Sequence, residues 1–142
     1  MLQNLLIVCT GNICRSPMGM AILQRLLPAV TVTSAGTNAL IGAQADPLAV
    51  ELIQQHGLDL TMHRGKQIDA DTARRADLIL VMEKYHKVFI ESRYVFAQGK
   101  TFLIRPEDLP DPYMRGIHAF QEAYAVLEES MDQWAKKLAQ IS

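Results

Sequence analysis

The chain has 142 residues and a formal net charge of −1, with 14 lysine and arginine residues against 15 aspartate and glutamate residues. This length predicts one domain with a substantial core, and the near-zero charge gives no electrostatic reason to expect a nucleic-acid partner. Two cysteines cannot build a disulfide scaffold, and the first apolar run, residues 5–9, is too short to cross a membrane and follows no basic segment. We therefore expect a cytoplasmic protein with reduced thiols and no membrane insertion.

Short apolar stretches alternate with helical patterns along the chain. The patterns predict strands at 4–8, 31–35, 77–82 and 100–104, and helices at 17–27, 46–56, 68–75, 83–93 and 117–140. Continuous apolar runs at 5–8 and 78–82 are typical of strands that helices cover on both sides. The sequence thus predicts a single α/β domain over residues 1–142, with a four-stranded parallel sheet and helices on both faces.

The segment after the first strand, Cys9-Thr-Gly-Asn-Ile-Cys-Arg-Ser-Pro17, combines a thiol and a guanidinium six residues apart. We call it the Cys9 loop; Ser16 suits a helix N-cap and Pro17 the first helical position. Backbone N–H groups converge at such a junction, so it predicts an oxyanion site, above all for phosphate. Arg15 can bind two phosphate oxygens, and the same positive field favours Cys9 as a thiolate nucleophile. The alternative is a buried cysteine beside a surface arginine.

Two further residues suit the Cys9 loop to this task. Gly11 permits a backbone conformation that other residues resist and lets the chain approach a ligand closely. Asn12 tolerates a left-handed backbone and can brace the loop with its amide, or it is an ordinary turn residue. Ser16 could both cap the helix and donate to the sulfur of Cys9.

A proline-rich segment, residues 105–113, carries the second chemical candidate. Three prolines exclude a helix and predict a stiff surface loop, which we call the Asp111 loop. A carboxylic acid facing the phosphate site could protonate a departing oxygen and then activate water. Asp111 lies between two prolines, which restrict its backbone. Glu107 and Asp108 compete for the role, and Asp-Pro could merely start a turn.

Neither the last helix nor the histidines predict a further site. Residues spaced by three and four along the last helix form one apolar face, which indicates core packing rather than an aromatic binding site. They are Phe120, Tyr124, Leu127, Met131, Trp134, Leu138 and Ile141. His56 and His63 show no metal-ligand spacing and build no plausible zinc site with the two cysteines. We expect His63 to bond within residues 58–66, and we expect no metal and no cofactor.

Four segments resemble the low-molecular-weight protein tyrosine phosphatases. The Cys9 loop resembles the phosphate loop of that family, and the other segments follow in the family's order over essentially the whole chain. They are Thr33-Ser-Ala-Gly-Thr37, Asp77-Leu-Ile-Leu-Val-Met82 and Asp111-Pro-Tyr113. In detail, the sequences of these segments are similar to those of bacterial members that act on tyrosine kinases of polysaccharide export.

The resemblance implies a phosphotyrosine phosphatase that works through a covalent phosphocysteine. It assigns catalysis to Cys9, Arg15 and Asp111. Phosphate binding falls to Thr10, Gly11, Asn12, Ile13, Cys14 and Ser16, with Tyr113 flanking the substrate ring and Ser34 bracing the loop asparagine. The implied partner is a phosphotyrosine protein, such as an autophosphorylated bacterial tyrosine kinase.

Three points stay open beside the resemblance. Many family members carry a second aromatic residue where this chain has Met114. Leu40 and Ile41 either form an apolar wall opposite Tyr113 or pack within their own loop. Cys14 resembles a family cysteine that pairs reversibly with the nucleophile, or it is a small buried side chain.

Other classes of function share parts of this pattern. A cysteine phosphocarrier of similar fold would not need Arg15 together with a distant acid. A thiol-coupled arsenate reductase would use further cysteines to relay its disulfide, and the chain has none beyond Cys14. An inactive phosphotyrosine-binding module would be expected to lack Cys9, Arg15 or Asp111, and all three are present.

Overall fold

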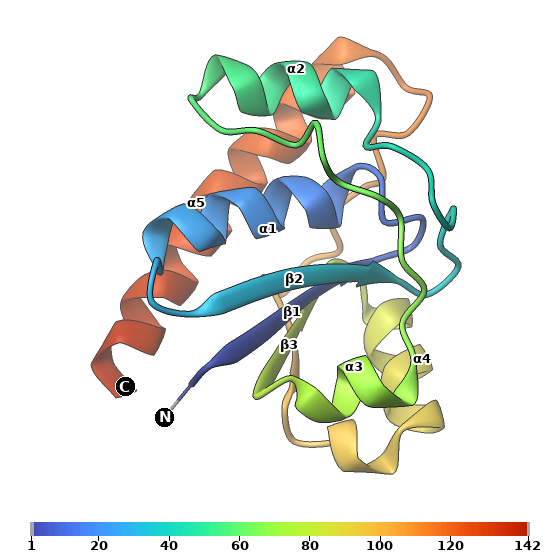
Figure 1. Ribbon diagram of the computed structural model, residues 1–142, viewed down its shortest axis with the longest axis vertical. Coiled ribbons are helices and arrows are strands. Elements are labelled where there is room, and N and C mark those ends of the chain that lie inside the picture. The colour runs from blue at the N-terminus through green and yellow to red at the C-terminus, as the bar shows by residue number, and fades with distance from the viewer. Residues whose placement is uncertain (1, 142) are drawn as a thin grey trace.

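The structure, a computed structural model, describes residues 2–141, along which strands alternate with helices (Figure 1). The strands are β1 Asn4–Cys9, β2 Thr31–Gly36, β3 Leu78–Val81 and β4 Thr101–Leu103. The helices are α1 Arg15–Leu26, α2 Pro47–Gln55, α3 Ala70–Arg75, α4 Lys84–Arg93 and α5 Ile117–Ile141, and a short 3-10 turn, η1, covers Val95–Ala97. Each strand and helix expected from the sequence is present, with bounds that differ by at most two residues.

The four strands form one parallel sheet in the order β2-β1-β3-β4. The predicted fold class is therefore confirmed. The central strand β1 pairs with β2 on one side and β3 on the other, with Val8 opposite both Ala35 and Val81. Because β1 is central, its carboxyl end at Cys9 lies between the ends of two neighbouring strands, where ligands bind in sheets of this kind.

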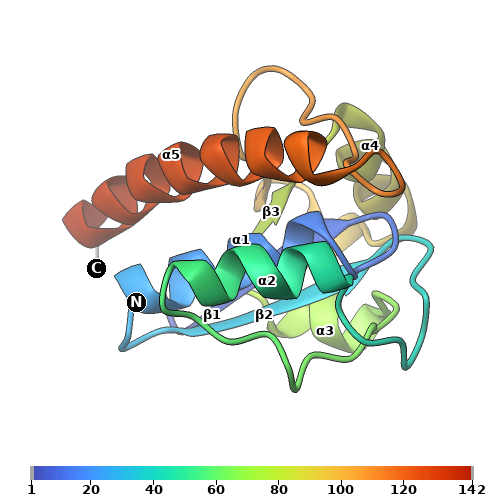
Figure 2. The same ribbon diagram turned by 90° about the horizontal axis from the view of Figure 1, so that it is seen from above.

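Helices cover both faces of the sheet, as Figures 1 and 2 show. Helices α1, α2 and α5 lie on one face, and α3 and α4 lie on the other. The alternation of side chains along β1 supplies both cores: Leu5 and Ile7 pack beneath α1 and α5, whereas Leu6 and Val8 pack with Ala73 of α3. None of the helices within residues 2–141 is both long and apolar enough to cross a membrane.

Two details of the helices differ from the sequence expectation. Helix α1 begins at Arg15 with Cys14 at its N-cap, so the prediction of Ser16 as N-cap was wrong. The helix starts earlier because the loop turns sharply at residues 11–14, which leaves Ser16 inside the first turn and buried. The apolar stripe of α5 packs as expected through Leu138, but Ile141 is 71% exposed and contributes nothing to the core.

Candidate active site

The backbone carbonyl groups of the Cys9 loop point outward and are held by neighbouring segments. Each carbonyl oxygen from residue 9 to residue 13 accepts one hydrogen bond of between 2.7 and 3.0 Å from outside the loop. The donors, in order, are the N–H groups of Thr37, Asn38 and Leu40, the ring Nε2 of His63 and the N–H of Asp46. Since C=O and N–H point in opposite directions across a planar peptide, the N–H groups that follow face the inside of the loop.

These inward N–H groups form a concave site for an anion. Within residues 2–141, no protein acceptor binds the N–H groups of residues 11–14. Asn12 has φ of 59°, in the left-handed region, and successive N–H groups around such a residue form an anion-binding nest. The start of α1 adds its dipole. Gly11 is not in the left-handed region, so Asn12 rather than Gly11 makes the unusual turn.

Asn12 is braced from below by a buried hydrogen-bond network. Its Nδ2 donates to Ser16 Oγ at 2.8 Å and to Ser34 Oγ at 2.9 Å, and its Oδ1 accepts from the Lys66 N–H at 2.9 Å. Gly36 allows β2 to approach the loop, since a Cβ there would lie 2.3 Å from the Thr10 carbonyl oxygen. The side chains of Asn12 and Ser16 therefore support the loop from beneath and do not line the cavity above it.

Cys9 lies at the base of this nest. Ser16 Oγ is 2.9 Å from Cys9 Sγ, accepts from Asn12 Nδ2 and lies 3.5 Å from the Ala35 carbonyl oxygen, so its hydroxyl can donate either to the sulfur or to that carbonyl. Cys9 and Cys14 are both buried free thiols. Burial is the main cause that raises the pKa of Cys14, with the nearby Asp46 carboxylate adding to it, so Cys14 stays protonated.

Arg15 is 1% exposed, and its guanidinium is only partly satisfied by protein groups. Its Nη1 donates to Glu83 Oε2 and to the Leu109 carbonyl oxygen, each at 2.6 Å. Its Nε and Nη2 form no hydrogen bond within the described residues, although Asp111 Oδ2 lies 3.6 Å from Nη2. Buried donors without an acceptor are costly, so these two nitrogens are suited to a bound oxyanion.

The Cys9 loop opens into a cavity of about 180 Å³. Its lining combines the nucleophile candidate, the arginine, the acid candidate and an apolar wall. The residues are Cys9, Thr10, Gly11, Ile13, Cys14, Arg15, Leu40, Asp111 and Tyr113. Residues from three separate parts of the chain thus meet at one site, at the carboxyl edge of the sheet.

The three acids of the Asp111 loop occupy different positions. Asp111 lines the cavity, and its Oδ1 accepts from the Tyr113 N–H at 3.1 Å. Asp108 instead accepts from the Lys84 N–H at 2.9 Å, at the start of α4. Glu107 is exposed, and neither it nor Asp108 lines the cavity. Of the three acids, only Asp111 can reach a substrate in this cavity.

The apolar rim is asymmetric. Tyr113 lines the cavity and is 44% exposed, but Met114 points into solvent with 84% of its surface exposed. On the opposite side Leu40 contributes to the lining, whereas Ile41 does not and is 75% exposed. Of the two possible apolar residues on each side, one therefore faces the cavity.

The sequence did not predict two residues that bind the cavity lining but do not themselves line it, Glu83 and His86. Glu83 binds Arg15, and His86 Nε2 lies 2.8 Å from Thr10 Oγ1. Their position directly after β3, at the carboxyl edge of the sheet, is the signal that could have found them. His63 was expected to bond within residues 58–66, which was wrong: its ring reaches the Asn12 carbonyl oxygen at 2.7 Å because the segment folds back over the Cys9 loop.

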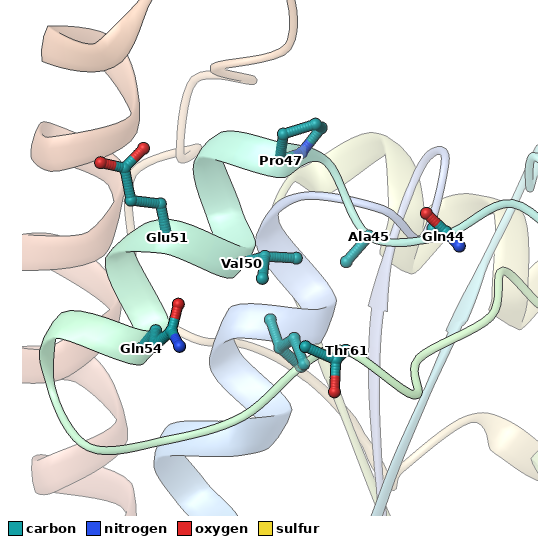
Figure 3. Close-up of a pocket in the computed structure, with 8 residues that line it drawn as sticks. Gln44, Ala45, Pro47, Val50, Glu51, Gln54 and Thr61 are labelled. Atoms are coloured by element: carbon teal, nitrogen blue, oxygen red, sulfur yellow. The ribbon is translucent and has the colours of Figure 1, made fainter.

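A second hollow, of about 390 Å³, lies between α2 and residues 60–61 (Figure 3). Its polar side chains, Gln44, Glu51, Gln54 and Thr61, are all exposed. The lining includes no cysteine, histidine or arginine. The hollow therefore offers no thiol or imidazole nucleophile and no arginine for an anion. The candidate catalytic groups Cys9, Arg15 and Asp111 all line the other cavity.

Comparisons with known proteins show the family of the chain. The model of the family described as low molecular weight phosphotyrosine protein phosphatase matches residues 4–141. The chain is 43% identical over 141 residues to the probable low molecular weight protein-tyrosine-phosphatase EpsP of Ralstonia nicotianae, covering 97% of each chain. Its fold is similar to that of the tyrosine phosphatase Wzb of Escherichia coli K30 in complex with sulphate, with a TM-score of 0.93, 42% identity and 97% and 99% coverage.

Solved structures of the same fold also include the YwlE arginine phosphatase of Geobacillus stearothermophilus, at 34% identity and a TM-score of 0.92, with 97% and 94% coverage. The fold alone thus accommodates phosphatases of two named specificities. The match over residues 4–141 and the identity to EpsP are nevertheless decisive at the level of the family. The chain belongs to the low molecular weight phosphotyrosine protein phosphatases.

Proposed function

We propose that the chain hydrolyses phosphotyrosine in protein substrates through a covalent phosphocysteine on Cys9. The observation that carries the proposal is the arrangement of donors around one thiol. The N–H groups of residues 11–14, which no protein acceptor binds within the described residues, and the two Arg15 nitrogens without a hydrogen bond there surround the cavity at whose base Cys9 lies. These donors match the charge that develops on the equatorial oxygens of a phosphoryl group during transfer.

In the first step the Cys9 thiolate attacks phosphorus. A sulfur–phosphorus bond forms as the bond from phosphorus to the tyrosine oxygen breaks. Asp111, which lines the cavity, gives its proton to the departing phenolic oxygen. Arg15 and the loop N–H groups bind the three remaining phosphoryl oxygens throughout.

In the second step water replaces the thiol. The Asp111 carboxylate takes a proton from the water as its oxygen bonds to phosphorus, and the sulfur–phosphorus bond breaks. The Ser16 hydroxyl, 2.9 Å from the sulfur, stabilises the departing Cys9 thiolate. Inorganic phosphate leaves and the enzyme returns to its starting state, so the cycle consumes one water and needs no metal.

The shape of the cavity favours phosphotyrosine among phosphorylated residues. Cys9 is almost fully buried at its base, so a substrate side chain must be long enough to bring phosphorus to the sulfur. Leu40, Ile13 and Tyr113 supply apolar surface for a phenyl ring. A phosphoarginine would bring several N–H donors that need acceptors. Asp111 is the one carboxylate among the lining residues, so the cavity offers these donors few partners.

The physiological substrate that we propose is an autophosphorylated bacterial tyrosine kinase of exopolysaccharide or capsule export. This part rests on the resemblance of the motifs to those bacterial family members. A thiol nucleophile functions in a reducing compartment, so the proposal includes a cytoplasmic location.

Steady-state turnover of matched phosphotyrosyl, phosphoseryl and phosphoarginyl peptides tests the proposal, with Cys9→Ser as the inactive control. We expect hydrolysis of the phosphotyrosyl peptide at least tenfold faster than of the other two. Preference for the phosphoarginyl peptide would overturn the substrate assignment. Thiol-dependent reduction of arsenate without peptide turnover would instead indicate an arsenate reductase, and a stable phosphocysteine would indicate a phosphocarrier.

A further inference from the structure

The segment from the end of β3 into the first turn of α4, residues 82–86, contacts Arg15, the Asp111 loop and the Cys9 loop. Glu83 binds Arg15, and the Lys84 N–H donates to Asp108. The Met82 carbonyl oxygen accepts from the Leu109 N–H at 3.0 Å. Through His86 the same turn also reaches the Cys9 loop. One short segment thus fixes the guanidinium, the Asp111 loop and the phosphate-binding loop relative to one another.

The two hydrogen bonds of His86 define its tautomer. The Glu83 N–H can only donate, so His86 Nδ1, 3.1 Å away, is the acceptor and carries no proton. In the neutral ring Nε2 then carries the proton and donates to Thr10 Oγ1 at 2.8 Å. His86 has no exposed surface, so water cannot replace either bond.

This geometry links His86 directly to the phosphate-binding backbone. Thr10 follows Cys9 in the chain and lines the cavity. The Thr10 carbonyl oxygen accepts from the Asn38 N–H at 3.0 Å. The bond from His86 holds the Thr10 side chain from a different element, α4. Because Thr10 is held at both its carbonyl oxygen and its side chain, the peptide group that follows it cannot rotate away from an anion bound in the loop.

We propose that His86 is a positioning residue for dephosphorylation, which fixes Thr10 and thereby aligns the N–H groups of the Cys9 loop with the guanidinium of Arg15. The inference rests on the proposed function, because it concerns the alignment that the reaction needs. His86 itself does not touch the cavity. Its effect is expected in the transition state, where the loop and Arg15 must bind the same phosphoryl group together.

The surroundings of His86 keep it neutral. Burial, followed by the positive charge of Arg15, lowers its pKa to about 4, whereas Asp108 and Asp111 act in the opposite direction. Glu83, on the same turn, is engaged with Arg15. A protonated ring would present Nδ1–H to the Glu83 N–H, so the observed pair of bonds requires the neutral form.

Two substitutions at residue 86 separate the two bonds. The side-chain oxygen in His86→Asn can replace Nδ1 as acceptor for the Glu83 N–H but cannot reach Thr10. The side-chain amide in His86→Gln can replace Nε2–H as donor to Thr10. Thr10→Val removes the hydroxyl without altering the turn. The control is His56→Asn, since His56 is also hydrogen-bonded, to the Leu52 carbonyl oxygen, but lies outside the site.

We expect His86→Asn and Thr10→Val each to lower kcat/KM roughly five- to thirtyfold, because each leaves one buried hydrogen-bonding group without its partner. Affinity for vanadate, which resembles the transition state, should fall in parallel, while affinity for inorganic phosphate changes less than twofold. The double variant should lose no more than either single one. His86→Gln and His56→Asn should stay within threefold of the wild type.

The opposite ranking, with His86→Gln impaired and His86→Asn intact, would show that the bond to Glu83 matters and would overturn the proposal. Equal loss in both, no loss in either, or normal kinetics for Thr10→Val would overturn it as well. Long-range ¹H–¹⁵N spectra give a test without turnover: we expect a protonated Nε2 that does not titrate between pH 7 and pH 5, and an Nδ1–H tautomer would refute the geometry. A wild-type protein that fails to hydrolyse phosphotyrosine refutes the proposed function, whereas normal wild-type turnover with unaffected variants refutes this inference alone.

Discussion

Arg15 Nη1 donates to Glu83 Oε2 at 2.6 Å, and this bond, together with the bond from the same nitrogen to the Leu109 carbonyl oxygen, orients the guanidinium. Arg15 extends from the first turn of α1, and Glu83 precedes α4, so the pair joins elements on opposite faces of the sheet. Nε and Nη2 form no hydrogen bond within the described residues, although Asp111 Oδ2 lies 3.6 Å from Nη2. A planar group fixed at one corner presents its other edge to a phosphate at little entropic cost.

Removal of Glu83 should therefore loosen Arg15. In Glu83→Ala the buried cation loses its partner, and we expect kcat/KM to fall about tenfold or more and the free energy of unfolding by about 1–3 kcal/mol, discounted because the Glu83 side chain is 29% exposed. Glu83→Gln keeps an oxygen acceptor of the same shape and should lose less of both. Peptide kinetics and urea unfolding check this. Wild-type values for Glu83→Ala would show that the Leu109 carbonyl suffices to hold Arg15.

The geometry of the guanidinium matters as well as its charge. Arg15→Lys retains the positive charge but loses the planar pair of donors, so we expect kcat/KM to fall on the order of a hundredfold or more and phosphate inhibition to weaken. Arg93→Lys, at an exposed position on α4, is the matched control. Near wild-type kinetics for Arg15→Lys would mean that charge alone accounts for the role of this residue.

Asp111 and Asp108 can be distinguished by the leaving group. Asp111→Asn should slow hydrolysis strongly for phenols that leave poorly, such as tyrosine, and much less for activated nitrophenols, because a good leaving group needs little protonation. Asp108→Asn keeps an acceptor for the Lys84 N–H and should leave this dependence unchanged. Rates over a series of aryl phosphates give the slope. A steeper slope in Asp108→Asn alone would transfer the acid role to Asp108.

The strands and the Cys9 loop could be predicted because their signals are local. Continuous apolar runs at residues 5–8 and 78–82 are enough to indicate buried parallel strands, and a thiol, a glycine and an arginine after such a run indicate an anion site. The choice of Asp111 over Asp108 could not be made from spacing, since both lie on one loop. It depends on the Lys84 N–H, which binds Asp108 from a different element.

Long-range contacts explain the remaining errors. The sequence offers no local sign that His63 reaches Asn12, 51 positions away, or that His86 reaches Thr10, 76 positions away. The N-cap assignment of Ser16 followed a local preference that the turn at Asn12 overrides. In each case the packing of the Cys9 loop against its neighbours decided the outcome.

The buried histidine should also make stability depend on pH. The fold lowers the pKa of His86 to about 4, whereas the ordinary pKa of histidine is about 6.5. Between these two pH values the His86 ring is protonated in the unfolded chain but not in the folded chain. Stability should thus decrease as the pH falls from about 6.5 to about 4, by about 3 kcal/mol. His63, whose pKa burial also lowers, adds a change of the same sign.

Urea unfolding of His86→Gln across this range should show a flatter pH dependence than the wild type, with the exposed His118→Gln as control. Asp69 and Asp77 do not interfere in this window. Hydrogen bonds from backbone N–H groups lower the pKa of each carboxyl, so their contributions are lost only at more acidic pH. A parallel pH dependence in His86→Gln and the wild type would show that His86 is not held neutral.

The central claim, that Cys9 carries the phosphoryl group, is tested most directly by trapping the intermediate. Wild-type protein is mixed with a phosphotyrosyl peptide, quenched in acid within milliseconds and digested, and the modified residue is located by mass spectrometry. The account predicts a phosphate on Cys9, absent in Cys9→Ser, which should still bind vanadate because the N–H groups and Arg15 remain in place. A phosphate on any other residue, or full turnover by Cys9→Ser, would contradict it.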